Sequence, residues 1–484
     1  MGLSQDSQIR VAELFAGVGG FRLGLEGDDY EFVFSNQWEP NETAQWASKI
    51  YVQRFGGKGH TNRDLHELCL EVPEHDMLVG GFPCQDYSVA RTISGELGIE
   101  GEKGKLWTPI REIIEHSKVR PKIIFLENVP RLLNSPSKFR GLNFAWILKD
   151  LLNLGYDVEW RVLQASDYGF PQKRKRVFIA AYRRATNTTF YRNGPGTHGP
   201  NTRTRGPMVK WLTGATIQGG NKDWKTGPFA KAFPAEGVLS KKKDPLPTVE
   251  NYTWSKKSSP FKNTGYAWRN NQGESWFWSF KSTPIFEGQH ITLNDILTEK
   301  TDDSYVISDK EKLRKYKYIK GEQKEWRIRK KDRIDAEGID AGSGNLWDMY
   351  QECTKSYNKE VWSQSRDSDA FRKGLGLGII YDYSAGSMAF PDSLSKPSRT
   401  VVTAEIGKSV SRMRHVIENP PKSGNYRGLM PIELERLNMF PDNWTEYIGI
   451  SDSRRGFLMG NALVVGIVEK LASPFAELIR DGSE

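Results

Sequence analysis

The sequence of 484 residues contains only three cysteines, Cys69, Cys84 and Cys353. Three cysteines cannot build a disulfide framework, and no paired Cys/His spacing of a zinc site occurs. No stretch reaches the roughly 18 consecutive apolar residues of a membrane helix, and the first residues lack the apolar block of a secretory signal. We therefore expect a protein of the reducing cytoplasm, with no membrane span and no metal centre.

The chain has enough hydrophobic residues to form a buried core. Hydrophobic residues make up 37% of it, and at about 100–200 residues per domain its length corresponds to two or three structural units. Lysine and arginine number 69 against 60 acidic residues, which gives a net charge of +9. This moderate excess permits a nucleic-acid partner but does not require one, because a basic surface also keeps proteins soluble.

The first 182 residues alternate short apolar runs with amphipathic stretches, the pattern of a doubly wound α/β sheet. Expected strands lie at residues 11–15, 32–35, 77–79, 123–126, 161–163 and 177–181, and expected helices at residues 108–116 and 144–154. The last sixty or so residues regain this regularity, with a helix expected at 431–438 and an apolar segment at 463–471. We interpret them as a return to the first domain.

The middle of the chain is irregular, polar and aromatic. Its aromatic residues include Tyr252, Trp254, Tyr266, Trp268, Trp276, Phe277, Trp278 and Phe280. A basic run follows at residues 310–333. This run is either a stripe that faces an anionic partner or a solvated helix face with acidic neighbours, and each aromatic residue has core packing as its alternative.

A glycine-rich turn follows the first expected strand. Gly17, Gly19 and Gly20 would let the backbone approach a ligand at the end of that strand. Gln37 and Trp38 follow the second strand, where nucleotide-binding α/β folds place a polar group and where an indole could stack on adenine. The alternatives are an ordinary strand–helix turn and a dinucleotide-dependent oxidoreductase, although the third glycine of the dinucleotide pattern is missing.

Cys84 comes just after the strand expected at 77–79, in a Gly/Pro-rich loop that Pro83 would stiffen. Ligands bind at the carboxyl ends of parallel strands, so this cysteine is placed as a nucleophile. The alternative, a small buried hydrophobic residue, suits Cys69 and Cys353 better.

Charged side chains stand at the ends of two further expected strands. Glu127 ends one of them, where a buried carboxylate is costly unless it is paired or functional. Arg174 and Arg176 precede the strand at 177–181 and point the same way if the segment is extended. A thiol, a carboxylate and two guanidinium groups at strand ends suggest nucleophilic attack with charge stabilisation.

Taken in order, these segments resemble the motifs of the DNA (cytosine-5)-methyltransferases. The matching segments are Phe-Ala-Gly-Val-Gly-Gly at 15–20, Gly-Gly-Phe-Pro-Cys-Gln at 80–85, Glu-Asn-Val at 127–129, Gln-Lys-Arg-Lys-Arg at 172–176, a ninth motif at 426–441 and a tenth from Gly460-Asn461 onward. The resemblance implies a methyltransferase that uses S-adenosylmethionine, needs no metal and acts on double-stranded DNA. Its expected fold is a mostly parallel α/β sheet with a second, irregular target-recognition domain.

The resemblance also implies a role for each motif residue. Cys84 would add to C6 of a cytosine flipped out of the duplex, Glu127 would hydrogen-bond N3, and Arg176, with Arg174 as second candidate, would contact O2. The residues implied on the cofactor side are Phe15, Gly17, Val18, Gly20, Gln37, Trp38, Asp64, Pro83, Leu106 and Asn461. Gln37 departs from the usual glutamate on the ribose, as do Met430 and Ile432 from the usual threonine and arginine of the ninth motif.

The expected domains are a catalytic domain of residues 1–183 and 455–484, a target-recognition domain of 184–425 and a hinge segment of 426–454. The implied activity is that of the modification arm of a bacterial restriction–modification system, a monomer that protects host DNA from a partner endonuclease. Two alternatives are a tRNA cytosine-5 methyltransferase, against which the long middle region argues, and a catalytically silent DNA-binding regulator, against which the intact Cys84, Glu127 and Arg176 argue.

Overall fold

The protein is described from a computed structural model. The structure describes residues 8–40, 42–82, 107–136, 139–184, 227–237, 243–247, 258–270, 273–299, 302–310, 312–313, 316, 324–328, 380–384, 390–407, 414–421 and 423–481. Cys84, Pro83 and Leu106 lie outside the described residues, as does most of the basic run at 310–333. Within the described part, no helix is long and apolar enough to cross a membrane.

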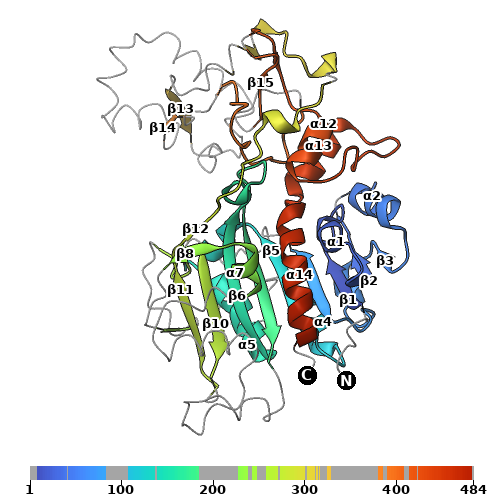
Figure 1. Ribbon diagram of the computed structural model, residues 1–484, viewed down its shortest axis with the longest axis vertical. Helices are drawn as coiled ribbons and strands as arrows, with labels where there is room; N and C mark the ends of the chain where they lie inside the picture. Colours follow the sequence, from blue (N-terminus) through green and yellow to red (C-terminus); the bar gives the residue numbers. More distant parts are fainter. Residues whose placement is uncertain are drawn as a thin grey trace, which may run out of the picture.

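A ten-stranded sheet forms the centre of the molecule (Figure 1). From one edge to the other its strands are β3 (His60–Thr61), β2 (Tyr30–Asn36), β1 (Ile9–Leu14), β4 (Met77–Gly81), β5 (Ile123–Asn128), β7 (Lys175–Arg183), β6 (Tyr156–Gln164), β10 (Thr264–Arg269), β11 (Ser275–Phe280) and β9 (Asp244–Pro245). The pairings are parallel from β3 to β5 and antiparallel from β5 onward. Because β7 runs against β5, its first residues lie at the same sheet edge as the carboxyl ends of the parallel strands.

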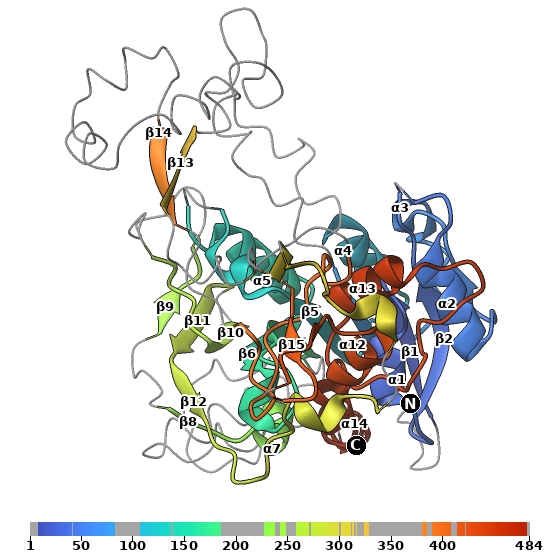
Figure 2. The ribbon, with the colours of Figure 1, turned by 90° about the horizontal axis from the view of Figure 1, so that it is seen from above.

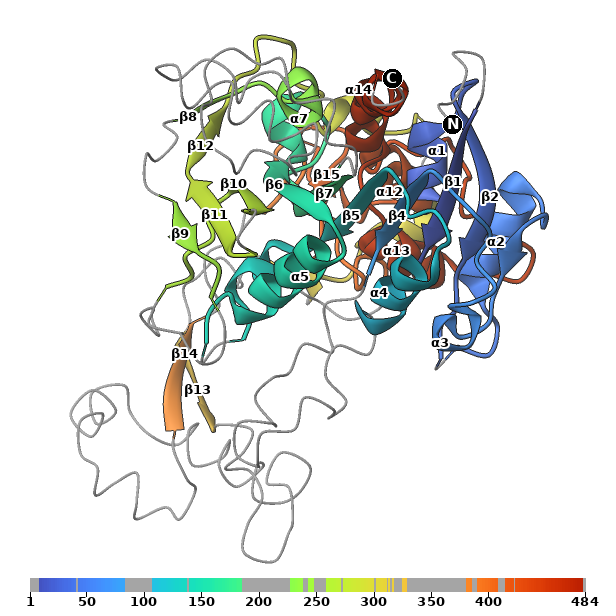
Figure 3. The same ribbon diagram turned by 90° about the horizontal axis from the view of Figure 1, so that it is seen from below.

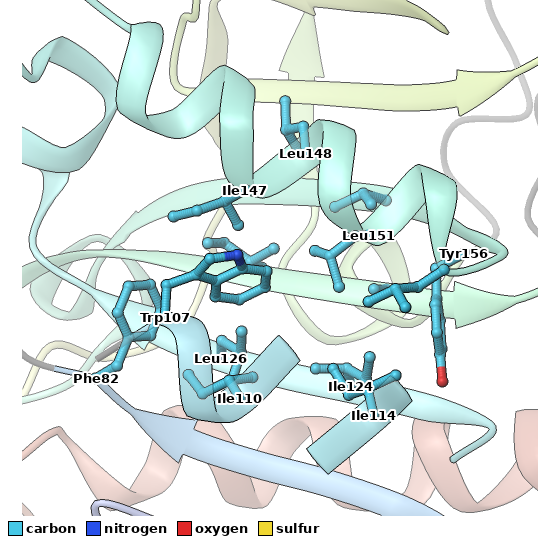
Figure 4. Packing of buried hydrophobic residues seen from close by; sticks show 14 of the residues in the cluster. Phe82, Trp107, Ile110, Ile114, Ile124, Leu126, Ile147, Leu148, Leu151 and Tyr156 are labelled. Carbon is cyan, nitrogen blue, oxygen red and sulfur yellow. The ribbon is translucent and has the colours of Figure 1, made fainter. Parts of the chain in front are cut away.

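Helices cover both faces of the sheet (Figure 3). One face carries α1 (Gly20–Leu25), α7 (Pro228–Ala232) and α14 (Val465–Asp481), and the other carries α4 (Trp107–His116) and α5 (Leu142–Asn153). The strands between the two layers contribute apolar side chains to a hydrophobic cluster on each face, as expected for parallel strands that are buried on both faces. Figure 4 shows the second layer, in which Phe82 packs beside Trp107 with ring centroids 6.2 Å apart.

Short elements complete the fold beyond the carboxyl edge of the sheet. The helices α12 (Pro431–Leu437) and α13 (Asp452–Asn461) pack against each other there (Figures 1 and 2). The remaining elements are α2 (Trp46–Phe55), α3 (Leu65–Leu68), β8 (Ala235–Gly237), β12 (Ser282–Pro284), β13 (Lys324–Ile328), β14 (Ile380–Ser384), β15 (Ile417–Glu418) and β16 (Tyr426–Arg427). The chain thus returns from α13 into α14, which lies along the first half of the sheet.

The predicted α/β fold with a doubly wound, mostly parallel sheet is confirmed for the half that carries β1 to β5. Part of the segment assigned to the recognition domain, 184–425, instead extends this sheet. Residues 264–267 of β10 pair with 158–161 of β6, and β11 pairs with β10 along its whole length. The buried aromatic side chains of Tyr266, Phe277 and Phe280 explain the placement, since they join the sheet core.

Candidate active site

The turn between β1 and α1 has a backbone that few sequences can adopt. Phe15, Gly17 and Gly19 all have positive φ angles, of 54°, 56° and 89°. A Cβ atom on Gly19 would lie 2.2 Å from the ring of Phe55, so a side chain there meets both backbone strain and a steric clash. A Cβ on Gly17 would instead meet nothing within 4 Å, so the turn leaves space beside this residue.

Side chains from distant elements hold this turn. Gln37 Oε1 accepts a 2.7 Å hydrogen bond from the backbone N–H of Gly17. The indole N–H of Trp444 donates to the carbonyl oxygen of Val18 at 2.8 Å. Gly20 packs against Leu463, whose Cγ lies 3.2 Å from the position that a Cβ would take. The turn is thus fastened to β2 and to the C-terminal segment.

Three further residues expected around the cofactor, Trp38, Asp64 and Asn461, lie toward the same edge of the sheet. Trp38, just after β2, exposes 38% of its surface. Asp64 is the N-cap residue of α3, and its Oδ1 accepts a 3.0 Å hydrogen bond from the N–H of His66. Asn461 ends α13 and is exposed. Trp38, Asp64 and the glycine-rich turn thus follow the carboxyl ends of three neighbouring parallel strands, β2, β3 and β1.

Glu39, two residues after Gln37, is held by an ion pair. The guanidinium of Arg454 on α13 lies 3.0 Å from Glu39 Oε1 and 2.8 Å from Glu42 Oε2. Burial raises the pKa of Glu39, and the positive charge of Arg454 offsets part of that shift. This ion pair joins the segment after β2 to the helix that ends at Asn461.

Phe82 and Trp107, the described residues on either side of residues 83–106, both lie in the apolar core. Phe82, the last described residue before Pro83, is buried, and its carbonyl oxygen accepts a 2.7 Å hydrogen bond from the side-chain amide of Asn128. Trp107, the first described residue after Leu106, is buried beside Phe82 and donates its indole N–H to Asp150 at 2.7 Å. Phe82 and Trp107 are therefore each fixed by a hydrogen bond to a neighbouring element.

Glu127 and Arg176 form an ion pair next to the carboxyl end of β4. Arg176 Nε lies 2.7 Å from Glu127 Oε1, and the two side chains are only 15% and 13% exposed. A Cβ on Gly81 would lie 3.3 Å from Glu127 Oε2, so the carboxyl group lies against the strand that leads to Cys84. Burial raises the pKa of Glu127, while the charges of Arg176 and Arg174 act in the opposite direction.

Arg174 has different partners from Arg176. Its side chain is 1% exposed, and it donates hydrogen bonds to the carbonyl oxygens of Val401 at 3.0 Å and Gly460 at 2.8 Å. Burial lowers its pKa well below the ordinary value, and the neighbouring charge of Arg176 adds to that effect. Arg174 thus fastens the start of β7 to two other segments, whereas Arg176 reaches Glu127.

Two buried residues that we did not single out from the sequence complete this connection. Gln172 Nε2 donates to Asn438 Oδ1 at 2.7 Å, and Gln172 Oε1 accepts a hydrogen bond from the N–H of Val401. Asn438 Nδ2 donates in turn to the carbonyl oxygen of Met459 at 3.0 Å. Both side chains are 0% exposed. Their place in the recognised motifs is the signal that could have identified them, since Gln172 opens the Gln-x-Arg-x-Arg segment and Asn438 directly follows α12 in the ninth motif.

The ninth motif is stabilised by a second buried charge pair. Arg427 donates two hydrogen bonds to Glu433, at 2.8 and 2.7 Å, and both side chains are nearly inaccessible. Met430, which departs from the family pattern, donates only its backbone N–H to the same carboxylate. That departure therefore leaves the ion pair intact.

A family model for C-5 cytosine-specific DNA methylases matches residues 9–476 of this chain. The chain belongs to this family. It is 35% identical to the type II methyltransferase M.Sau3AI of Staphylococcus aureus, over 98% of this chain and 96% of that protein. It is 37% identical to the type II methyltransferase M.HhaI of Haemophilus parahaemolyticus, over 37% of this chain and 50% of that protein.

The methylase also resembles the crystal structure of S. pombe Dnmt2 methyltransferase. The TM-score is 0.51 at 13% sequence identity, and the match covers 98% of this chain and 99% of that one. At this identity the likeness shows a shared fold alone. Family and fold together support S-adenosylmethionine as the methyl donor of this methylase, which makes an oxidoreductase untenable.

The family gives the methylase its DNA substrate but leaves the contacts to DNA open. Six aromatic residues of the middle region lie in β10 and β11, where Trp268 and Trp278 pack with ring centroids 4.5 Å apart. Among the described residues, no group of three or more His, Cys, Asp or Glu side chains could hold a metal ion.

Proposed function

We propose that this methylase transfers the methyl group of S-adenosylmethionine to C5 of a cytosine in duplex DNA through a transient bond between Cys84 Sγ and C6. The observation that carries the proposal is the Glu127–Arg176 pair, 2.7 Å apart, beside the strand that leads to Cys84. A carboxyl group and a guanidinium at one site can hydrogen-bond to N3 and O2, which are neighbouring atoms on one edge of cytosine.

The nucleophile overcomes the low reactivity of the ring. C5 of cytosine is a poor nucleophile, and addition of the Cys84 thiolate to C6 turns the ring into an enamine with electron density at C5. When bound, S-adenosylmethionine supplies the methyl group on a positively charged sulfur. After C5 is methylated, its proton passes to water, the electron pair of the C5–H bond re-forms the C5–C6 double bond, and the Sγ–C6 pair returns to sulfur, which restores the aromatic ring and the free thiolate.

Glu127 and Arg176 stabilise the charge that this addition creates. Burial raises the pKa of Glu127, which favours a protonated carboxyl group that can donate to N3. The guanidinium of Arg176, which now contacts Glu127, would reach O2 and hold the ring while the adduct exists. Asn128 fixes the backbone of Phe82, two residues before Cys84.

The cofactor would lie along the turn between β1 and α1. The positive φ angles of Phe15, Gly17 and Gly19 give the turn a backbone that admits a ligand at close range, and the exposed Trp38 would cover the adenine. Because Gln37 Oε1 already accepts the N–H of Gly17, its amide N–H groups are the atoms left to meet ribose hydroxyls.

We infer the DNA substrate form from the chemistry and the biological role from proteins similar to this chain. Addition to C6 and methylation at C5 occur from the faces of the ring, which neighbouring bases cover in a stacked duplex, so the target base must leave the helix. M.Sau3AI matches nearly the whole chain and is named a type II methyltransferase. We infer the same role here: a cytoplasmic monomer that modifies a short recognition sequence and protects host DNA from a partner restriction endonuclease.

The test is methyl transfer from S-adenosylmethionine to unmethylated genomic DNA, mapped by cytosine-resolution sequencing. Methylated cytosines within one short sequence are the expected result, and they also supply the recognition site. Folded protein that binds the cofactor but leaves DNA unmethylated would overturn the proposal. Transfer of the methyl group to tRNA would then favour the tRNA methyltransferase, and tight DNA binding without turnover would favour the silent DNA-binding regulator.

A further inference from the structure

Three buried polar side chains lie in a row next to the Gln-x-Arg-x-Arg segment. Ser398 Oγ lies 2.8 Å from His415 Nε2, and His415 Nδ1 lies 2.8 Å from Glu405 Oε1. The backbone N–H of His415 donates to the same Glu405 oxygen at 2.5 Å. Ser398, His415 and Glu405 are 3%, 1% and 5% exposed.

A serine, a histidine and a carboxylate in this order also form the nucleophilic sites of many hydrolases. Such a site needs a serine hydroxyl that a substrate can reach. Ser398 is 3% exposed, and its hydroxyl also lies 2.8 Å from the carbonyl oxygen of Arg399. The arrangement therefore holds a segment in place and does not cleave a bond.

The held segment pairs with the start of the arginine motif. The N–H of Ser398 donates to the carbonyl oxygen of Pro171 at 2.7 Å, and the carbonyl oxygen of Ser398 accepts from the N–H of Lys173 at 2.8 Å. Ser398 and Gln172 thereby form a parallel bridge. The hydroxyl of Thr400 donates to the carbonyl oxygen of Lys173 at 2.7 Å, which adds a third link.

The hydrogen bonds of Ser398 and Thr400 end at Lys173, three residues before Arg176, and a bond of Arg174 follows. Lys173 is bonded to Ser398 and Thr400, Arg174 is bonded to the carbonyl oxygen of Val401, and β7 begins at the next residue. Arg176 then contacts Glu127. A movement of residues 398–401 would therefore be passed along a continuous hydrogen-bonded backbone to the guanidinium of Arg176.

We propose that His415 is a positioning residue for methyl transfer: through Ser398, with Glu405 orienting the imidazole, it sets the segment from which Arg176 reaches the target base. The proposal rests on the proposed function, because it assigns a role toward the Arg176–Glu127 site. A displacement of about 1 Å at a catalytic group can lower a rate roughly 100-fold while ground-state binding persists.

The test uses Ser398→Ala, His415→Asn and His415→Gln in the full chain. Asparagine retains an amide near the Nδ1 position and loses the reach to Ser398, whereas the glutamine amide can replace Nε2. Ser395→Ala is the matched control, since Ser395 is exposed and lies in the same segment. Steady-state kinetics with DNA and S-adenosylmethionine, thermal melting and the rate of covalent trapping on 5-fluorocytosine DNA are measured for each.

We expect Ser398→Ala and His415→Asn to lower kcat and the trapping rate by about 10- to 100-fold, with KM for DNA and for the cofactor within about 3-fold of the wild-type values. His415→Gln should recover most of the rate. A lower melting temperature with unchanged kcat, or a raised KM for DNA with unchanged kcat, would overturn the assignment. If the wild-type protein itself transfers no methyl group, the proposed function fails rather than the role of His415.

Discussion

The side-chain amide of Asn128 donates a 2.7 Å hydrogen bond to the carbonyl oxygen of Phe82, and both residues are buried. The side-chain oxygen Oδ1 of Asn128 also accepts a hydrogen bond from the N–H of Val129, so the amide group cannot rotate without losing a bond. It joins the strand that carries Glu127 to the strand that leads to Cys84.

Asn128→Ala should therefore impair catalysis more than cofactor binding. The substitution leaves a buried carbonyl oxygen without its donor, at a cost of about 1–3 kcal/mol, and frees the backbone two residues before Cys84. We expect kcat to fall about 10- to 100-fold while the Kd for S-adenosylhomocysteine changes little. Asn134→Ala, at an exposed position nearby, is the control. An unchanged kcat would show that the loop does not depend on this bond.

Arg174→Ala should act on stability. Its guanidinium is fully buried and supplies donors to the carbonyl oxygens of Val401 and Gly460. Removing it leaves two acceptors and a cavity, which together cost about 2–4 kcal/mol. Urea unfolding, with Lys175→Ala at the exposed neighbouring position as control, measures the change in the free energy of unfolding. A difference below about 0.5 kcal/mol between the two variants would contradict a structural role.

Glu13 should make stability fall as pH rises. It is completely buried in β1, accepts a 2.9 Å hydrogen bond from Tyr51, and burial raises its pKa to about 8. Between its ordinary pKa of 4.5 and about 8, the unfolded chain has lost a proton that the folded protein keeps, so the free energy of unfolding decreases across this range. The decrease is about 1.4 kcal/mol per pH unit at most.

Glu13→Gln should remove this dependence, because a neutral amide can replace the neutral acid. Melting temperatures of the wild type and the variant, measured between about pH 5 and about pH 9, should diverge, with the variant relatively more stable at the alkaline end. Glu31→Gln, at an exposed position of β2, should follow the wild type. Parallel curves for Glu13→Gln and the wild type would mean that Glu13 ionises normally.

The sequence predicted the strands and helices of the catalytic half closely, since their apolar runs are continuous. The expected strand at 123–126 lies within β5, and the expected helix at 108–116 lies within α4. The expected strand at 161–163 covers only the end of β6, because β6 begins with buried charged residues. Glu159 and Arg161 form an ion pair with both side chains 2% exposed, which an apolar pattern cannot reveal.

The rest of the fold could not be predicted, because it depends on contacts between segments that are distant in the sequence. β10 pairs with β6 although about a hundred residues separate them, and no local pattern states that partnership. The apolar segment predicted at 463–471 continues in the structure as α14 to Asp481, across Pro474, because the helix packs along the sheet core. Likewise, spacing placed Arg174 and Arg176 together, but only tertiary structure separates the residue that binds backbone carbonyls from the one that meets Glu127.

The most direct test of the account is covalent trapping on duplex DNA that contains the recognition sequence with 5-fluorocytosine at the target position. Fluorine cannot leave as a proton does, so the Sγ–C6 bond should persist after methyl transfer. We predict an adduct that survives denaturation, with mass spectrometry placing the modified base on the peptide that contains Cys84. Cys84→Ser should give no adduct, and Arg176→Ala should form it at least about 10-fold more slowly. An enzyme that methylates ordinary DNA yet forms no adduct, or forms it at another residue, would contradict the assignment of Cys84 as nucleophile.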